Sequence, residues 1–278
     1  ISSKRKEIRL LKEQRKAIID DGILYGFGDT ETKDSGIYWL GNIPKDWEVL
    51  PLKRIAKVNA SIADAVKKMN DKELVTFLPM ENVSATGEID NSIKKELQQV
   101  KTGYSSFAKG DVVVAKITPC FENGKGADLS NLDTPIGFGT TEFINIRPSE
   151  KILSEYLYLI TMTRPFRLLG EKIMTGSAGQ KRISVDYIKN FSLGIPTVES
   201  QEMILSKIHN LLKKVDDAIQ TEEQNIKLLE ELKIRIISDA VTGQVDLSEE
   251  YIPEKTAEEL DEDFIEDDED ADPNDEEV

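Results

Sequence analysis

The stretch from Glu199 to Val241, ESQEMILSKIHNLLKKVDDAIQTEEQNIKLLEELKIRIISDAV, decides the architecture of this 278-residue chain. Its apolar residues recur at spacings of three and four and form one stripe, made of Ile208, Leu211, Val215, Ala218, Leu229, Leu232 and Ile236 and widened by Leu212, Ile219 and Ile226. This period predicts one helix over residues 199–241, about 60 Å long at ~1.5 Å per residue. Because a helix of that length rarely buries its whole stripe against its own small domain, the pattern also predicts a coiled-coil partner.

A shorter helix is expected over residues 4–21, where apolar residues recur with the same spacing and Gly22 is the predicted stop. The sequence IRLLKE at 8–13 matches IKLLEE at 226–231, and IIDD at 18–21 matches IISD at 236–239 at the same offset. These matches predict that the chain begins at the end of one module and contains a further one. We therefore expect residues 4–21 to pair with a long helix, either in this chain or in a second copy.

Between the two helices the pattern changes to that of a mixed domain. The apolar runs DVVVA at 111–115 and FINI at 143–146 are bounded by glycine and proline and predict strands. Residues 151–170 are expected to be helical, and residues 22–36, rich in Gly, Asp and Thr, are expected to form a linker. The predicted fold class is α+β, with a mixed α/β domain followed by a long coiled-coil-forming helix.

The net charge of −16 is concentrated at the end of the chain. Residues 249–278 contain 17 Asp and Glu and one Lys, so residues 1–248 contain 35 acids (52 − 17) and 35 bases (36 − 1). The neutral body leaves a nucleic-acid partner open, although the whole chain is acidic. The tail has few apolar residues, which predicts disorder over residues 248–278.

The chain carries few residues that could form a catalytic site. Cys120 is the only cysteine and His209 the only histidine, so a structural zinc site is not expected and a catalytic triad would depend on His209 alone. We find no phosphate-binding loop, no methyltransferase motif and no apolar run near 18 residues. The N-terminal ISSKRKEIRLL lacks an initiator Met and the apolar core of a signal peptide. These features predict a non-catalytic, cytoplasmic chain, without a metal or cofactor of its own, that is a fragment or a processed product.

Four blocks of the sequence resemble, in order and spacing, the specificity subunits of type I restriction-modification enzymes. They are DSGIYWLGNIPKDWEV at 34–49, GTTEF at 139–143 with Arg147 and Pro148, GQKRIS at 179–184 leading to Ile195 and Pro196, and Glu199-Ser200-Gln201 with the helix that follows it to Gly243. The resemblance covers about residues 4–247. Members of that family usually carry two target-recognition domains, whereas this chain has room for one, and its exit segment has Pro196 as its only proline.

The resemblance implies the C-terminal half of such a subunit. The implied parts are the end of a spacer helix at 1–22, a linker at 23–43, a DNA target-recognition domain at 44–198, a distal spacer helix at 199–247 and an acidic tail at 248–278. A chain of this family is expected to recognise one half of a bipartite double-stranded DNA target. It is also expected to bind methyltransferase (modification) subunits and the restriction motor subunit, with S-adenosylmethionine, ATP and Mg²⁺ on those partners, and it can self-associate through the spacer helices.

Two polar, Gly-rich segments are the candidate DNA-reading loops. In KITPCFENGKG at 116–126, Lys116 and Lys125 are expected to contact phosphates, and Thr118 and Asn123 are expected to reach base edges. A solvated hairpin loop is the competing interpretation of this segment.

In the second segment, TGSAGQKR at 175–182, the small residues Ser177 and Gly179 allow the backbone to approach a phosphate. Gln180 can pair bidentately with adenine, and Lys181 and Arg182 supply positive charge. A purely structural loop is again the alternative. Further candidates for DNA contacts are Lys101, Tyr104, Thr140 and Thr141.

Two alternatives remain open at this point. Trp39 and Trp47 flank Pro44, where they can either stack on bases or pack the entry of the domain against the helices. At the level of function, the chain can also be a coiled-coil interaction protein whose acidic tail mimics DNA and inhibits a DNA enzyme. Such a protein would bind that enzyme without binding DNA.

Overall fold

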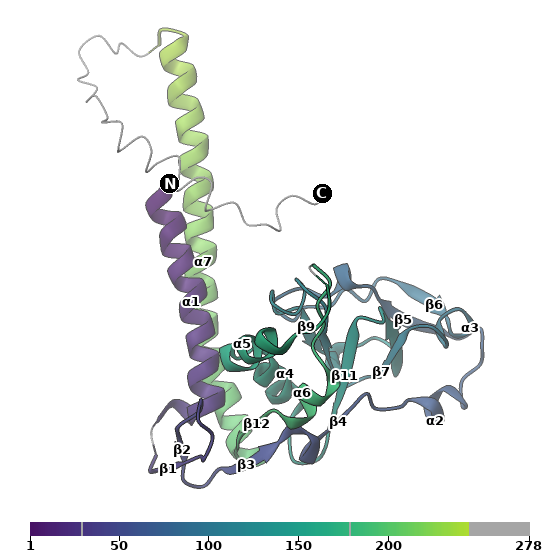
Figure 1. Cartoon of the computed structure of the whole chain (residues 1–278). Helices are drawn as coiled ribbons and strands as arrows, with labels where there is room; N and C mark the ends of the chain where they lie inside the picture. The colour runs from purple at the N-terminus through teal and green to yellow at the C-terminus, as the bar shows by residue number, and fades with distance from the viewer. Residues whose placement is uncertain (29, 178, 245–278) are drawn as a thin grey trace. The chain divides into compact units, whose positions relative to one another are not determined.

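The computed structural model describes residues 1–28, 30–177 and 179–244 (Figure 1). The predicted disordered tail at 248–278 lies outside these residues. The chain divides into two compact units, one of residues 1–15 with residues 211 onward, and one of residues 16–210. Among the described residues, no helix is long and apolar enough to cross a membrane.

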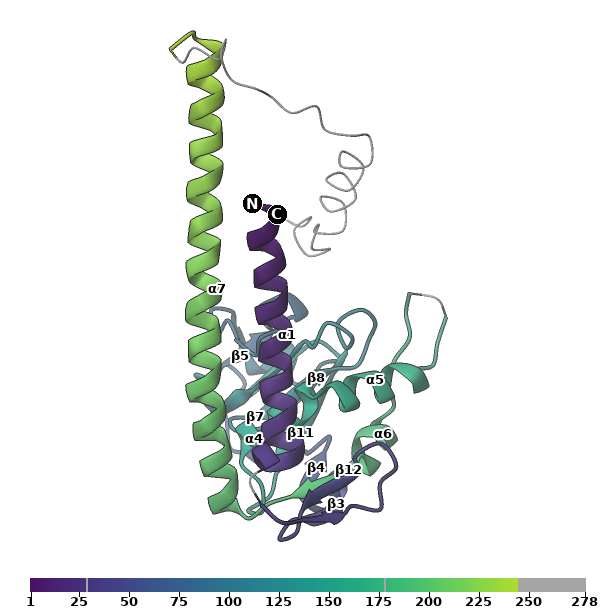
Figure 2. The same ribbon diagram turned by 90° about the vertical axis from the view of Figure 1, so that its left-hand side faces the viewer.

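The first unit is a pair of antiparallel helices. It contains the first part of α1 (Ser2–Tyr25) and the part of α7 (Val198–Val241) from Leu211 onward, which lie side by side in Figures 1 and 2. Ion pairs between the two helices join Lys4 to Glu222 at 2.8 Å, Arg5 to Glu230 at 3.5 Å and Arg15 to Asp216 at 3.2 Å. The predicted unbroken helix over 199–241 is confirmed, and the predicted pairing of residues 4–21 occurs within the chain.

The far end of α7 keeps an uncovered apolar face. The exposed large apolar side chains of its last turns are Leu228, Leu229, Leu232, Ile234, Ile236, Ile237 and Val241. In contrast, Ile8 of α1 and Leu212 and Val215 of α7 are buried. The stripe seen in the sequence is therefore covered over only part of its length by the residues that the structure describes.

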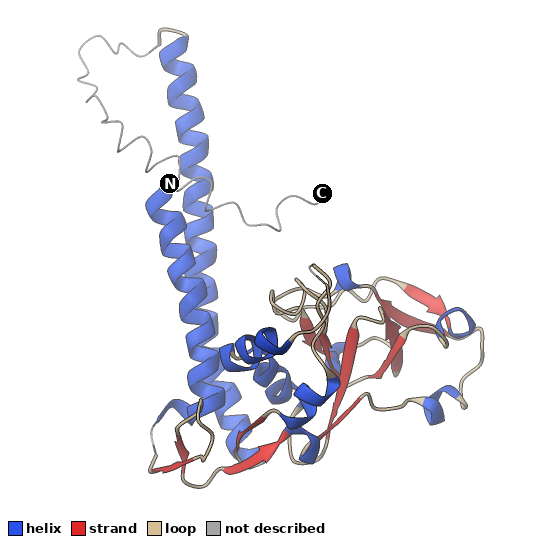
Figure 3. Cartoon of the chain, in the orientation of Figure 1, coloured by secondary structure: helices blue, strands red, loops and turns tan. Residues whose placement is uncertain are grey.

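The second unit contains two four-stranded sheets, seen among the strands of Figure 3. One has the order β6-β5-β10-β7, formed by Lys94–Glu96, Leu74–Leu78, Ile136–Gly139 and Ser105–Ala108. The other has the order β4-β11-β8-β9, formed by Ala56–Val58, Phe143–Pro148, Val112–Ala115 and Gly126–Asp128. All neighbours are antiparallel except β5 and β10, which are parallel. The strands predicted at 111–115 and 143–146 are confirmed as β8 and β11.

Smaller elements complete this unit. Two short ladders join β1 (Thr32–Asp34) to β2 (Asn42–Pro44) and β3 (Glu48–Pro51) to β12 (Ser192–Ile195). The short helices are α2 (Ala63–Val66), α3 (Leu97–Val100), α4 (Ser154–Met162), α5 (Arg164–Ile173) and α6 (Val185–Asn190). Single 3-10 turns are η1 (Gly26–Gly28), η2 (Leu52–Arg54), η3 (Met80–Asn82) and η4 (Leu129–Asn131). The predicted α+β class is confirmed.

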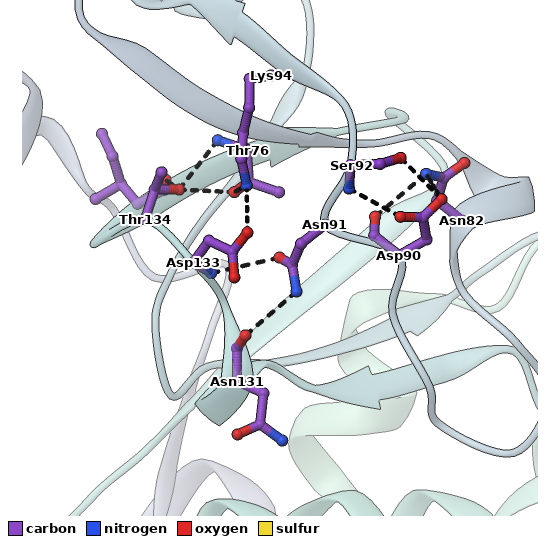
Figure 4. A network of polar contacts seen from close by, with 10 residues as sticks. Thr76, Asn82, Asp90, Asn91, Ser92, Lys94, Asn131, Asp133 and Thr134 are labelled. Carbon is purple, nitrogen blue, oxygen red and sulfur yellow. Dashed lines mark hydrogen bonds and ion pairs between the residues drawn. The ribbon is translucent and has the colours of Figure 1, made fainter.

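Apolar side chains of both sheets form the core of the second unit. Val113 and Ala115 of β8 are fully buried in one cluster with Phe107 of β7 and Phe143 of β11. This cluster joins the two sheets, because β7 and β11 belong to different ones. A polar network lies at the β6 edge of the β6-β5-β10-β7 sheet. There the ammonium of Lys94 contacts Thr76 Oγ1 at 2.9 Å and Asp133 at 2.8 Å (Figure 4).

Two local predictions are wrong. Gly22 lies inside α1, which continues to Tyr25; a Cβ atom at this position would lie 2.8 Å from Ile208 Cδ1, so the glycine permits close approach of α7. The helix predicted over 151–170 is two helices, α4 and α5, separated at Thr163. The break follows from Pro165, because its ring would clash with the carbonyl four residues earlier in a continuous helix, whereas proline is favoured in a first turn.

Candidate nucleic-acid interface

The two candidate loops are adjacent and are joined by backbone hydrogen bonds. The N–H of Thr118 donates to the carbonyl of Lys181 at 3.0 Å, and the N–H of Ile183 donates to the carbonyl of Lys116 at 2.9 Å. The pairing is antiparallel and centred on Ile117 opposite Arg182. Lys116 directly follows the buried strand β8. The ladder therefore attaches the second loop to the end of that strand. Two segments that are 49 positions apart in the sequence, from Gly126 to Thr175, therefore form one surface.

The second loop is a hairpin whose backbone depends on glycine. Thr175 and Arg182 exchange two backbone hydrogen bonds, of 2.8 and 3.1 Å. Gly176 and Gly179 have φ of +136° and +78°, and a Cβ atom on Gly176 would lie 2.7 Å from the carbonyl oxygen of Gln180. Other residues rarely adopt these conformations. The hairpin presents Ser177, Gly179, Gln180 and Lys181 to solvent.

Arg182 occupies a different environment from Lys181. Its Nη2 and Nε donate to Glu142 Oε1 and Oε2 at 2.8 and 3.0 Å, and its Nη1 donates to the carbonyl of Gln180 at 3.2 Å. The hydrogen bonds from Arg182 hold the pKa of the Glu142 carboxyl below its ordinary value, and those to Glu142 raise the pKa of Arg182. The guanidinium thus fastens the base of the hairpin to the residue before β11.

The first loop is a compact turn held from below by Arg167 of α5. Phe121 is fully buried, and its N–H donates to the carbonyl of Ile117 at 2.9 Å. Arg167 Nη1 donates to the carbonyl of Phe121 at 2.8 Å, and Nη2 donates to that of Gly124 at 3.3 Å. The guanidinium is almost fully buried, and desolvation lowers the pKa of Arg167 to about 10. Two buried carbonyls and one buried cation therefore fix the shape of this loop.

Arg167 was missed by sequence reasoning, because an arginine in a short helix is expected to be exposed. The available signal was the spacing of Phe166, Arg167 and Gly170, which are the buried residues of α5 and lie on one helix face. Gly170 allows the contact, since a Cβ atom there would lie 2.5 Å from the ring of Phe121.

The polar side chains predicted in the first loop differ in exposure. Asn123 is exposed, whereas Lys116, Thr118 and Lys125 are half-buried. Thr118 Oγ1 donates to Glu122 Oε1 at 3.2 Å, and Lys125 Nζ lies 3.5 Å from the carbonyl oxygen of Met80. Asn123 is therefore the most accessible of the four, and the ammonium of Lys116 makes no ion pair within the described part of the chain.

A polar pocket of about 310 Å³ lies beside the paired loops. It occurs where β7 of one sheet meets β11 of the other, a junction that the hydrogen bond from Ser105 Oγ to the carbonyl of Phe143 spans at 2.9 Å. Its lining is Asn59, Ala60, Ser61, Tyr104, Ser105, Ser106, Lys116, Thr141, Phe143, Ile144, Asn145 and Val185. The sequence prediction included Lys116, Tyr104 and Thr141 but missed the serines and Asn59, whose φ of +53° is uncommon outside glycine.

Asp111, which is buried, holds one wall of this pocket in place. Arg147 donates from Nε and Nη2 to the two oxygens of Asp111 at 2.7 and 2.9 Å, and it donates from Nη1 to the carbonyl of Ser61 at 3.1 Å. Asn145 Nδ2 donates to the carbonyl of Ala60 at 3.1 Å and to Asp111 at 3.3 Å. Hydrogen bonding to Asp111 raises the pKa of Arg147. Asp111 therefore positions the backbone carbonyls of Ser61 and Ala60 through Arg147 and Asn145.

Of the four further candidates, two make polar contacts within the protein. Tyr104 is exposed at the pocket and stands edge-on to Phe77, with ring centroids 5.0 Å apart. Thr141 is also exposed. Lys101 pairs with Asp71 at 2.9 Å, and Thr140 Oγ1 accepts from the N–H of Glu142 at 3.3 Å.

The two tryptophans serve packing. Trp47 is 3% exposed and lies against Gly194, where a Cβ atom would approach its ring to 2.9 Å. Trp39 stacks on Phe191 with ring centroids 5.3 Å apart. Of the two interpretations that the sequence left open, packing is confirmed for Trp47, whereas Trp39 is half-buried.

The described part of the chain shows no cluster of metal-binding side chains. No group of three or more His, Cys, Asp and Glu residues there is arranged to hold a metal ion. His209 Nε2 lies 2.5 Å from Glu155 Oε1 at the surface, far in the sequence from both loops.

Comparison with known proteins identifies the family. The sequence model of the type I restriction modification DNA specificity domain matches residues 44–231, and the chain belongs to this family. The specificity subunit of the type I restriction enzyme EcoAI of Escherichia coli is 38% identical over 191 residues, which cover 68% of this chain and 31% of that protein. That of EcoEI, from the same organism, is 36% identical over the same shares. The chain thus spans about a third of the length of these relatives, and the family resemblance is confirmed.

Solved structures support the fold. The HsdS subunit of Thermoanaerobacter tengcongensis aligns with a TM-score of 0.52 and 12% identity, over 87% of this chain and 53% of that one. A chain from a study of assembly and conformational transition of the type I R-M system aligns with a TM-score of 0.54 and 13% identity, over 86% of this chain and 55% of that one.

Proposed function

We propose that this chain binds double-stranded DNA sequence-specifically and reads one half of a bipartite target, as part of a type I specificity subunit. The observation that carries this proposal is the ladder between Lys116–Thr118 and Lys181–Ile183, which joins two polar loops into one surface beside a polar pocket. The family match over residues 44–231 covers both loops.

The residues of this surface suit different contacts. Gln180 and Asn123 are exposed amides, which can pair with base edges. Thr118 lies in the loop ladder, where its N–H donates to the carbonyl of Lys181, and its hydroxyl is a further candidate for a base contact. Lys181, Lys116 and Lys125 supply ammonium groups for phosphates, and Ser177 and Gly179 let the hairpin backbone come close to the duplex. Arg182 contributes by holding the hairpin through Glu142.

The chain is proposed to be non-catalytic and to work with partner subunits. Methyltransferase subunits would bind the α1–α7 pair, and a restriction motor subunit would join the complex, with S-adenosylmethionine, ATP and Mg²⁺ held by those partners. The exposed apolar side chains at the end of α7 support a protein partner there, and self-association through the same helices is the other use of this face. Because its partners act on cellular DNA, the proposed location is the cytoplasm.

The alternative function, an interaction protein whose acidic tail mimics DNA, has no support in the comparisons. The relatives are named as specificity subunits of restriction enzymes. The family match also lies over residues 44–231, and the acidic tail lies beyond it.

Deleting the gene and mapping DNA methylation across the genome tests the proposed function. We expect one methylated bipartite sequence to disappear and to return when the gene is restored. An unchanged methylation map in a host that expresses the partner subunits would contradict the proposal.

A further inference from the structure

We propose that the polar pocket between β7 and β11 is a subsite for one phosphodiester of the DNA backbone, with Lys116 as its ammonium ligand. This inference rests on the proposed function and names a contact within it. The pocket lies wholly in the second unit and shares Lys116 with the first candidate loop.

The side chains around the pocket are of the kinds that bind phosphate oxygens. Lysine, serine, threonine, asparagine and tyrosine are among the side chains that donate hydrogen bonds to DNA phosphates. The polar lining residues are Asn59, Ser61, Tyr104, Ser105, Ser106, Lys116, Thr141 and Asn145. No carboxylate is among the lining residues. Ser105 and Asn145 already donate to groups of the protein, so the donors available to a ligand belong to the remaining polar residues, with Lys116 as the single ammonium group. An ammonium group with hydroxyl donors and no carboxylate in the lining favours an anion over a cation.

The surrounding charges favour the same occupant. Two carboxylates lie next to the pocket. Asp111 is paired with Arg147 at 2.7 Å. Glu142 follows Thr141, and its pKa is lowered first by its hydrogen bonds from Arg182 and then by the charge of Lys116. The guanidinium of Arg182 already neutralises Glu142 at 2.8 Å. The charge of Lys116 is therefore left for a ligand, since its ammonium makes no ion pair within the described residues.

Shape distinguishes a phosphate from a base edge. The base edges of a duplex lie within its grooves, so a projecting element such as the hairpin at Gln180 can reach them. Phosphates project from the duplex and can enter a concave site. A phosphate beside the ladder of the two loops would fix their register along the DNA, which is the usual role of backbone contacts.

The test uses the full chain assembled with its methyltransferase subunits, and duplexes of its methylated target. Each phosphodiester of the target is replaced in turn by an uncharged methylphosphonate, and binding is measured for wild type and for Lys116→Met. Lys109→Met is the matched control, because Lys109 is exposed at the opposite end of β8. Thr141→Val serves as a second variant, since it removes a hydroxyl from the pocket without changing charge.

We expect one position at which the methylphosphonate weakens binding by wild type and Lys109→Met roughly three- to tenfold, but leaves binding by Lys116→Met unchanged. Thr141→Val should reduce the penalty at the same position. The slope of log K against log salt should fall by about 0.9 for Lys116→Met, as for one lost phosphate contact.

The inference is overturned if no position couples to Lys116, or if Lys116→Met alters preference at one base pair with an unchanged salt slope. In either case selective binding by wild type would still support the proposed function. Loss of all sequence selectivity in the wild-type complex would overturn both.

Discussion

Arg182 binds the carboxylate of Glu142 with three hydrogen bonds, from Nε at 3.0 and 3.3 Å and from Nη2 at 2.8 Å. This pair fastens the hairpin at 175–182 to the strand that forms one side of the pocket. It also neutralises a carboxylate whose pKa is lowered, after these hydrogen bonds, by the charge of Lys116. Arg182 therefore affects DNA binding through Glu142, while Lys181 beside it faces solvent.

Replacing Arg182 with Ala should weaken DNA binding by roughly three- to tenfold, because the freed carboxylate of Glu142 would repel phosphates. The double variant Arg182→Ala/Glu142→Gln should recover most of the lost affinity. The measurement is the affinity of the assembled complex for its target duplex. A double variant as weak as Arg182→Ala alone would mean that Arg182 contacts DNA itself.

Replacing Lys181 with Ala should weaken binding to all duplexes by similar factors. An exposed ammonium that contacts a phosphate releases counterions whatever the neighbouring bases are, so the salt slope should fall by about 0.9. Binding to a panel of duplexes at two salt concentrations measures both effects. A change confined to one base position would show that Lys181 reads a base instead.

Replacing Gln180 with Ala should act at one base pair. If its amide pairs with adenine, the variant should lose about 1–3 kcal/mol of discrimination there and little elsewhere. The salt slope should stay as in wild type, because an amide carries no charge. Unaltered preference at every position of the target would remove Gln180 from the reading surface.

Replacing Asp111 with Ala should destabilise the recognition domain by about 2–4 kcal/mol, since it leaves Arg147 and Asn145 without their buried acceptor. The matched control is Asp133→Ala. Asp133 forms an ion pair of 2.8 Å with Lys94, but its side chain is 56% exposed. This control should cost less than about 1 kcal/mol. Urea unfolding of the two variants measures the difference, and equal losses would show that Asp111 does not organise the pocket wall.

The long helices were predictable because their information is local. Apolar residues recur at three-to-four spacing from Ile208 to Ile236, and a helix places residues at this spacing on one face. The strand at Val112–Ala115 was predictable for a similar reason, as an apolar run ended by turn residues.

The wrong boundaries at Gly22 and Thr163 show where local rules fail. Gly22 resembles a helix stop in sequence, but contact with Ile208 places it inside the helix. The break after α4 could have been found from Pro165, which begins a helix more readily than it continues one.

The candidate site was only partly predictable, because its geometry is non-local. Both loops stand out by their polar and glycine residues, but nothing in the sequence indicates that Thr118 would pair with Lys181. The same holds for Asp111 and Arg167, whose partners are backbone and side-chain groups far along the chain. Side chains that lie together only after folding, such as Asn59 and Ser106 at the pocket, leave no pattern in one sequence.

The most direct test of the central claim is an exchange of the recognition domain. Residues 44–198 would be replaced by the aligned segment of the Escherichia coli EcoAI specificity subunit, and genomic methylation would be mapped in cells that supply the partner subunits of this chain. We expect the modified sequence to change in one half of the bipartite target and to stay the same in the other. Methylation at the original, unchanged sequence by the exchanged protein would contradict the account, because another part of the complex would then determine the target.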